Sequence, residues 1–128
     1  MTNVSPSQWP IESPYHCRML DGKCGRPLMG MTRALGGRSP DFGVRVVGVN
    51  PGLTNTERAE RMLKGWSANA HGTPERWKEV MADMNLPFAR MGEASEVAAV
   101  VAFLASERAS YVSGTIVTVD GGAANRNA

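Results

Sequence analysis

The sequence predicts an α/β fold in which two parallel strands are flanked by helices. Two observations support this prediction. Residues 44–49 (VRVVGV) and 115–119 (TIVTV) are rich in β-branched residues, as strands covered on both faces of a parallel sheet are. Residues 50–114, which connect them, contain several helical patterns. A strand–helix–strand crossover of this kind is overwhelmingly parallel and right-handed.

The first predicted helix precedes the first strand. Leu28, Met31 and Leu35 recur at i, i+3 and i+7, and Gly36-Gly37 follows where a helix needs residues that tolerate positive φ to stop. Residues 1–27 hold four of the eight prolines and show no helical or strand periodicity. We therefore expect residues 1–27 to be irregular and to lie outside the fold.

Two short helices are predicted after the Pro51-Gly52 turn that ends the first strand. Thr54 and Glu57 have capping-box spacing, which favours a solvated helix over about residues 55–64, ended by Gly65. Thr73-Pro74 then starts a second helix. Its apolar face consists of Trp77, Val80, Met81 and Met84. That face favours packing against other elements, and lining of a substrate pocket is the alternative.

The strongest helical pattern covers residues 93–106. Its apolar stripe is formed by Val97, Val100, Val101 and Leu104 and is widened by Ala98 and Ala105, so the helix must lie against an apolar surface. Gly114 then turns the chain into the second strand, which ends at Asp120-Gly121-Gly122. Residues 123–128 are predicted to be a polar tail.

Composition excludes several classes of protein. Hydrophobic content of 42% and charged content of 20% are typical of globular proteins, so neither disorder nor a fibrous class is indicated. The net charge of +2 is spread along the chain, which gives no basic stripe for nucleic acid. No apolar run is long enough to span a bilayer, so no membrane partner is expected.

The cysteines and histidines show no metal-binding pattern. Cys17 and Cys24 are not accompanied by further residues at ligand spacing, and no signal peptide precedes them. We interpret them as free thiols of a cytoplasmic protein. His16 and His71 stand apart and have no ligand-like neighbours, so no metal site is predicted.

Three stretches together resemble the C-terminal half of a short-chain dehydrogenase/reductase. They are LMGMTRALGG, GVRVVGVNPGLTNT and PFARMGEASEVAAVVAFLASERASYVSGTIVTVDGG. The resemblance runs from about Leu28 to Gly122 with several fixed spacings in order. It implies the C-terminal portion of a Rossmann-like doubly wound parallel sheet, in which residues 44–49 form the sixth strand and residues 115–119 the seventh.

The resemblance also implies a function. In the family, the turn at Pro51-Gly52 backs the nicotinamide of NAD or NADP, Thr56 holds its carboxamide, and the backbone of Thr54 takes part. Residues 57–85 correspond to the loop that closes over an alcohol or carbonyl substrate. Family members transfer a hydride between an alcohol and a carbonyl with NAD or NADP. They are commonly homo-oligomers. Ligands of such sheets bind beyond the carboxyl ends of the strands, which is where this turn lies.

The chain departs from the family pattern at the catalytic positions. The positions of the family's tyrosine and lysine fall on Asp21 and Gly25, while Tyr15 and Lys23 are too far apart to share a helix face at i, i+4. A glycine-rich dinucleotide motif after an initial strand is also absent. We therefore predict no catalytic residue in this chain and expect a truncated family member.

Several alternatives stay open at this point. Two strands leave a sheet edge uncovered, so further strands are expected from the N-terminus, a partner chain or a larger protein. Thr54 and Thr56 are interpreted equally well as helix caps. Besides an NAD(P)-dependent oxidoreductase or a piece of one, the sequence is compatible with a non-catalytic fragment that associates with itself or with a full-length relative.

Overall fold

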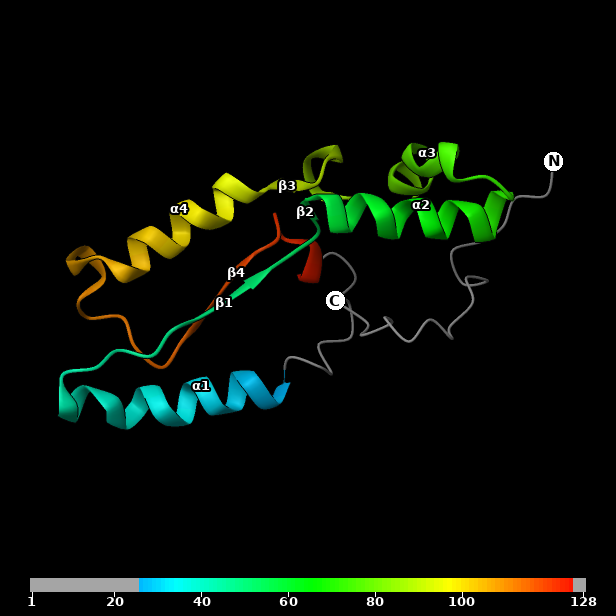
Figure 1. The fold of residues 1–128 in the computed structure, drawn as a ribbon. Coiled ribbons are helices and arrows are strands. Elements are labelled where there is room, and N and C mark those ends of the chain that lie inside the picture. The colour runs from blue at the N-terminus through cyan, green and yellow to red at the C-terminus, as the bar shows by residue number, and fades with distance from the viewer. Residues whose placement is uncertain (1–25, 126–128) are drawn as a thin grey trace.

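Helices lie on both faces of a short parallel sheet in the computed structural model, which describes residues 26–125 (Figure 1). In chain order the elements are α1 (Arg26–Arg38), η2 (Ser39–Phe42), β1 (Gly48–Pro51), β2 (Thr54–Asn55), α2 (Glu57–His71), η3 (Pro74–Arg76), α3 (Trp77–Asp83), η4 (Pro87–Ala89), β3 (Gly92–Glu93), α4 (Ala94–Ala105), η5 (Glu107–Ala109), β4 (Ile116–Val119) and η6 (Ala123–Asn125), where η denotes a short 3-10 helix. β1 and β4 pair in parallel, with Gly48 opposite Ile116 and Pro51 opposite Val119. The predicted α/β fold with a parallel crossover is confirmed.

Helix α1 is longer than predicted at both ends. It begins at Arg26 and continues through Gly36 and Gly37 to Arg38, so the predicted stop at Gly36-Gly37 is wrong and the fold begins two residues before the expected boundary. Gly36 instead allows close packing, because a Cβ there would lie 2.3 Å from the Cα of Gly114. Residues 1–25 lie outside the described part of the chain. The irregular structure expected for them therefore stays a prediction.

The first strand is shifted relative to the prediction of 44–49. Pairing starts at Gly48 and continues to Pro51 because β4 offers partners only over residues 116–119. Before Gly48, the chain contacts a loop, where the backbone N–H of Gly114 donates to the carbonyl of Val46 at 2.8 Å. Val44 is 53% exposed, so the expectation that both faces of the valine run are covered is wrong at that end. The second strand agrees with its prediction to within one residue.

Helices α2 and α3 pack together beyond the carboxyl ends of β1 and β4 (Figure 1). Leu63 of α2 and Val80 of α3 are fully buried between them. The predicted apolar face of α3, formed by Trp77, Val80, Met81 and Met84, packs against this cluster, as the packing interpretation expected. We call these two helices with η3 the α2–α3 unit.

The predicted end of α2 at Gly65 is wrong. The helix continues to His71 and stops where Gly72 adopts the left-handed conformation with φ of 72°. A glycine inside a helix costs about 1 kcal/mol relative to alanine. The added turns bury Ser67 completely, and its hydroxyl donates to the carbonyl of Thr73 at 2.7 Å. This packing explains why Gly65 does not end the helix.

Helix α4 lies where it was predicted, but its apolar stripe is only partly covered, with Val97 and Val100 half-buried. Leu104 is buried, whereas Val101 is 47% exposed.

The polar tail expected from residue 123 begins with the η6 turn, and residues 126–128 lie outside the described part. Over residues 26–125, no helix is both long and apolar enough to cross a bilayer, and no three potential metal ligands come together.

Candidate functional site

The four predicted cofactor residues, Pro51, Gly52, Thr54 and Thr56, lie in one loop at the carboxyl end of β1. We call residues 51–56 the wall loop. Gly52 donates its N–H to the carbonyl of Val119 at 2.9 Å. A Cβ on Gly52 would lie 2.7 Å from the Cβ of Asp120. The wall loop therefore rests directly on the end of β4, and only glycine fits at this contact.

The two threonine hydroxyls make different bonds within the wall loop. Thr54 donates its hydroxyl to the carbonyl of Gly52 at 3.0 Å. Thr56 donates to the carbonyl of Thr54 at 3.4 Å, and its Oγ1 accepts from the N–H of Ala59 at 3.2 Å. Thr56 is thus the N-cap of α2, and the capping box predicted from Thr54 and Glu57 is wrong. Thr54 is half-buried, while Thr56 faces solvent.

Replacing Thr56 with alanine should lower the free energy of unfolding by about 1 kcal/mol, because the N–H of Ala59 loses its capping acceptor. Urea unfolding followed by circular dichroism measures this change. Thr73→Ala is the matched control, since the hydroxyl of Thr73 donates to the exposed carboxylate of Glu75 and makes no capping bond to the backbone of η3. Equal losses for the two variants would contradict a capping role for Thr56.

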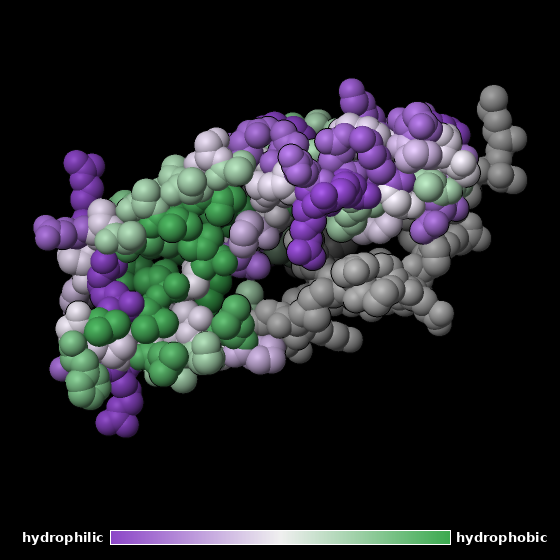
Figure 2. Space-filling view, viewed as in Figure 1, coloured by the Kyte–Doolittle hydropathy of each residue, from purple (hydrophilic) through white to green (hydrophobic). Residues whose placement is uncertain are grey.

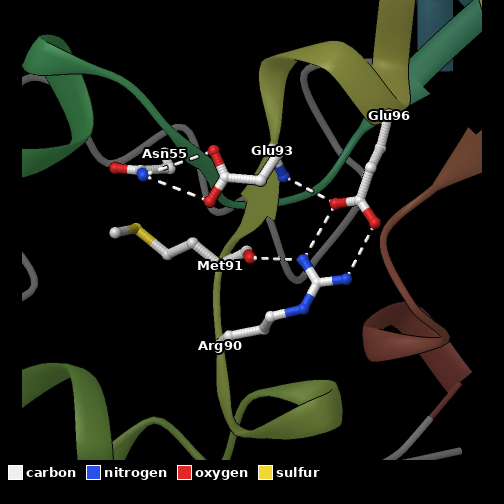
Figure 3. Close-up of polar contacts among 5 residues, drawn as sticks. All are labelled: Asn55, Arg90, Met91, Glu93 and Glu96. Carbon is white, nitrogen blue, oxygen red and sulfur yellow. Dashed lines mark hydrogen bonds and ion pairs between the residues drawn. The ribbon is translucent and has the colours of Figure 1, made fainter. Parts of the chain in front are cut away.

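A second, two-residue parallel pairing supports the wall loop from outside the sheet. Thr54 and Asn55 of β2 lie opposite Gly92 and Glu93 of β3. The side-chain amide of Asn55 donates to the carboxylate of Glu93 at 3.2 and 3.4 Å (Figure 3). The wall loop is thereby tied to the segment that leads into α4.

An ion-pair cluster, defined by Asn55, Arg90, Glu93 and Glu96, fixes that segment (Figure 3). Arg90 donates to both carboxylate oxygens of Glu96 at 2.8 and 2.7 Å, and Glu96 also accepts from the N–H of Glu93 at 2.7 Å. The bond from Arg90, then the backbone bond and the charge of Arg90, lower the pKa of Glu96 to about 2. Single motifs do not predict this cluster, although Glu93 and Glu96 have the spacing of a capping box.

Acidification should weaken the fold through Glu96. Because its pKa in the folded protein is about 2, below the ordinary value of 4.5, its stabilising effect is complete above about pH 4.5 and is lost as the pH falls towards 2. We expect the melting temperature of the unaltered protein to fall as the pH is lowered from about 4.5 towards 2. The melting temperature of Glu96→Gln should fall less over the same range. The difference between the two pH profiles isolates Glu96 from Glu60 and Glu79, whose pKa values are also lowered by their cationic neighbours. Parallel profiles would contradict the assignment.

The wall loop offers hydrogen-bonding groups but no acid or base. It presents threonine hydroxyls and backbone groups, each of which donates or accepts hydrogen bonds, and it contains no residue that titrates near neutral pH. The positions of the family's tyrosine and lysine, Asp21 and Gly25, lie outside the described residues. The described residues of the candidate site therefore offer hydrogen bonds but no group for proton transfer near neutral pH.

Comparison with known proteins identifies the family. Residues 26–124 match the family described as enoyl-(acyl carrier protein) reductase. The curated proteins similar to this chain include levodione reductase of Leifsonia aquatica, 38% identical over 95 residues. The chain belongs to the short-chain dehydrogenase/reductase family. The match begins at the first residue of α1 and ends within η6, so it covers nearly all of the described fold.

Other members of the short-chain dehydrogenase/reductase family show the same partial coverage. Galactitol 2-dehydrogenase (L-tagatose-forming) of Cereibacter sphaeroides is 44% identical over 92 residues, which are 72% of this chain and 32% of that protein. The 3-oxoacyl-[acyl-carrier-protein] reductase of Thermotoga maritima is 34% identical over 122 residues, which are 95% of this chain and 44% of that protein. The chain thus spans less than half the length of these curated relatives.

Solved structures of family members agree with the fold. Levodione reductase superposes with a TM-score of 0.67 at 33% identity, over 81% of this chain and 39% of that structure. L-sorbose reductase from Gluconobacter frateurii, solved with NADPH and L-sorbose, superposes with a TM-score of 0.67 at 30% identity, over 78% and 38%. The expected Rossmann-like fold of a short-chain dehydrogenase/reductase is confirmed over the part of the family that this chain spans.

Proposed function

We propose that the wall loop forms the nicotinamide side of an NAD(P) site in an oxidoreductase that transfers a hydride between an alcohol and a carbonyl. Pro51 and Gly52 supply the backbone surface, and Thr54 and Thr56 hold the carboxamide. The α2–α3 unit, which follows the wall loop in the chain, is the segment that encloses the small-molecule substrate. The full reaction is a property of a whole family enzyme, of which this chain spans less than half.

The position of the wall loop is the single observation that carries this proposal. The loop lies at the carboxyl ends of two parallel strands, held there by the bond from Gly52 to Val119 and by its contact with Asp120. Dinucleotides bind at this end of such sheets. L-sorbose reductase, with which this chain shares its fold, was solved with NADPH.

The groups present fit a nicotinamide carboxamide. A carboxamide offers both a donor and an acceptor, and a threonine hydroxyl can serve both. Thr56 faces solvent, and its Oγ1, which already accepts from Ala59, has a second lone pair that can accept from the carboxamide N–H. The bound nicotinamide supplies the hydride chemistry. The residues of the wall loop orient the ring, and the proton transfer that accompanies hydride transfer requires a group from outside this loop.

Fluorescence titration of the purified chain with NADPH and with NADH tests the proposal. Trp66 and Trp77 lie in the α2–α3 unit, so a nucleotide bound at the wall loop should quench their emission. We expect saturable quenching and about tenfold weaker binding for Thr56→Gly, the equivalent of one lost hydrogen bond. Glycine is chosen because it replaces a threonine cap at a cost of only a few tenths of a kcal/mol.

Asn69→Gly is the control, since Asn69 is exposed near the C-terminal end of α2. It should leave the affinity unchanged. Absence of saturable binding, or equal affinity of Thr56→Gly and the unaltered chain, would overturn the proposal and favour a non-catalytic fragment that associates with another chain. The cytoplasmic location and the homo-oligomeric state stay predictions.

A further inference from the structure

Arg58 places a positive charge where helix α2 does not favour one. It is the second residue of the helix, which begins at Glu57 after the N-cap Thr56. The N-terminal end of a helix carries a partial positive charge and favours acidic side chains. Arg61, one turn later, adds repulsion between like charges. Arg58 is exposed, and none of the ion pairs within residues 26–125 includes it, so no described contact explains its charge.

Gly65 lies on the same side of α2, and packing does not explain it either. Residues 58, 62 and 65 are spaced at i, i+4 and i+7, which places them along one side of a helix. A Cβ on Gly65 would meet no atom within 4 Å. A glycine inside a helix lowers stability relative to alanine. We call Arg58, Met62 and Gly65 the open flank of α2.

The open flank faces away from α3. Helix α2 buries Ala59 and Leu63 in the core of the α2–α3 unit, and Ser67 bonds to the carbonyl of Thr73, which precedes η3. At about 100° per residue, the open flank lies on the opposite side of the buried stripe from Ser67. Figure 1 likewise shows α3 on one side of α2 only. Helix α3 therefore leaves the open flank uncovered.

The charged end of the open flank adjoins the wall loop. Arg58 follows Thr56 by two positions, and the Cα–Cβ bonds of a helix tilt towards its N-terminus, so the side chain of Arg58 starts in the direction of the wall loop. Gly65 lies about 10 Å further along the helix axis. Figure 2 shows strongly hydrophilic residues over α2, whereas the hydrophobic residues gather between α4 and α1. A ligand at the open flank thus meets a cation beside the wall loop, then the half-buried Met62 and open space.

A negatively charged ligand would account for both unusual residues. Departures from the local rules of charge and helix propensity are expected at functional sites. A carboxylate accepts two parallel hydrogen bonds from the planar guanidinium group and would neutralise Arg58. An apolar body attached to that carboxylate would contact Met62 and occupy the space beside Gly65.

We propose that the open flank determines substrate specificity and selects an oxo acid with an apolar body, or the hydroxy acid formed from it. Arg58 binds the carboxylate, and the apolar body lies along Met62 in the space that Gly65 leaves. This inference deepens the proposed function and rests on it, because it names the class of carbonyl compound that meets a nicotinamide at the wall loop.

Titration of the isotope-labelled full chain with β-benzoylpropionate, followed by NMR, tests this inference. The acid has a carbonyl, a phenyl ring and a carboxylate, and its methyl ester is the matched uncharged probe. Without added cofactor, we expect saturable shifts of the Arg58 side-chain N–H and the Gly65 backbone N–H signals with the acid. The ester should bind at least about tenfold more weakly, the equivalent of one lost charge-assisted hydrogen bond.

Three variants of the chain locate the binding. Arg58→Met should weaken binding of the acid about tenfold and leave binding of the ester unchanged, because methionine keeps the apolar stem and removes the charge. Arg33→Met removes a charge from an exposed position of α1 and should change neither. Gly65→Leu should weaken binding of the acid while raising the melting temperature, because leucine favours a helix more than glycine does. A folding defect cannot produce that combination.

Several outcomes would overturn the inference. They are absence of saturable binding of the acid, equal affinities for acid and ester, equal effects of Arg58→Met and Arg33→Met, and unchanged affinity of Gly65→Leu. Weaker NADPH binding by Arg58→Met with unchanged binding of the acid would assign Arg58 to the cofactor, and would overturn it as well. Selective binding of the acid by a chain that fails to bind NADPH would contradict the proposed function and leave the selectivity of the open flank intact.

Discussion

Replacing Gly36 with alanine should lower the free energy of unfolding by about 3 kcal/mol, at the upper end of the usual cost of overpacking. The added Cβ would lie 2.3 Å from both the Cα and the N of Gly114 and 2.8 Å from the carbonyl oxygen of Val46. These are backbone atoms, so no side chain can rotate away. Helix α1 must move off the sheet, which strains the bond from the Ser113 hydroxyl to the carbonyl of Gly36.

The neighbouring glycine provides the control for this prediction. Gly37 lies in the same helix, and a Cβ there meets nothing within 4 Å. Gly37→Ala should raise the free energy of unfolding by about 0.5–1 kcal/mol, because alanine is the better helix former. Urea unfolding followed by circular dichroism compares the two variants. Similar effects of both substitutions would show that α1 does not pack closely against the loop before β4.

The strands could be predicted from their β-branched residues, but their ends could not. Val44 and Val47 have the same side-chain pattern as Val49, yet only Val49 belongs to β1. The difference arises from the partner, because β4 is paired from Ile116 onwards and the chain before it forms a loop. Strand boundaries thus depend on a segment distant in sequence, which a local pattern does not contain.

Glycines misled the prediction of helix ends for a related reason. Gly36 and Gly65 were both interpreted as stops, yet both lie inside helices, whereas Gly72, with φ of 72°, ends α2. At Gly36 the missing side chain permits a tertiary contact with Gly114. The sequence shows that a glycine is present, but only the fold shows whether it is needed for its backbone conformation or for close packing.

The sequence places the residues of the candidate site close together, but it does not show the contacts that support them. Pro51, Gly52, Thr54 and Thr56 were singled out from a continuous segment, and they lie in one loop as a local segment must. The cluster around Arg90 was missed because it joins Asn55 to Glu93, which is 38 positions away in the chain. Candidate residues in a single turn can be recognised in a sequence, whereas the contacts that hold the turn cannot.

Replacing Arg45 with methionine should lower the free energy of unfolding by about 3 kcal/mol. Methionine keeps most of the apolar stem, so the loss reports on the guanidinium group. That group donates to the carbonyls of Leu104, Ser106 and Ala109, at the end of α4 and in the turn that follows it. Hydrogen exchange should accelerate first in the last turn of α4, where these bonds are made.

Arg45→Lys separates charge from geometry. A lysine carries the same charge but cannot bond three carbonyls with a planar fork, so it should restore about half of the loss. Full restoration by lysine would mean that charge at the C-terminal end of α4 is sufficient, through its favourable interaction with the helix dipole. Partial restoration shows that Arg45 joins the segment before β1 to the end of α4 through directed bonds.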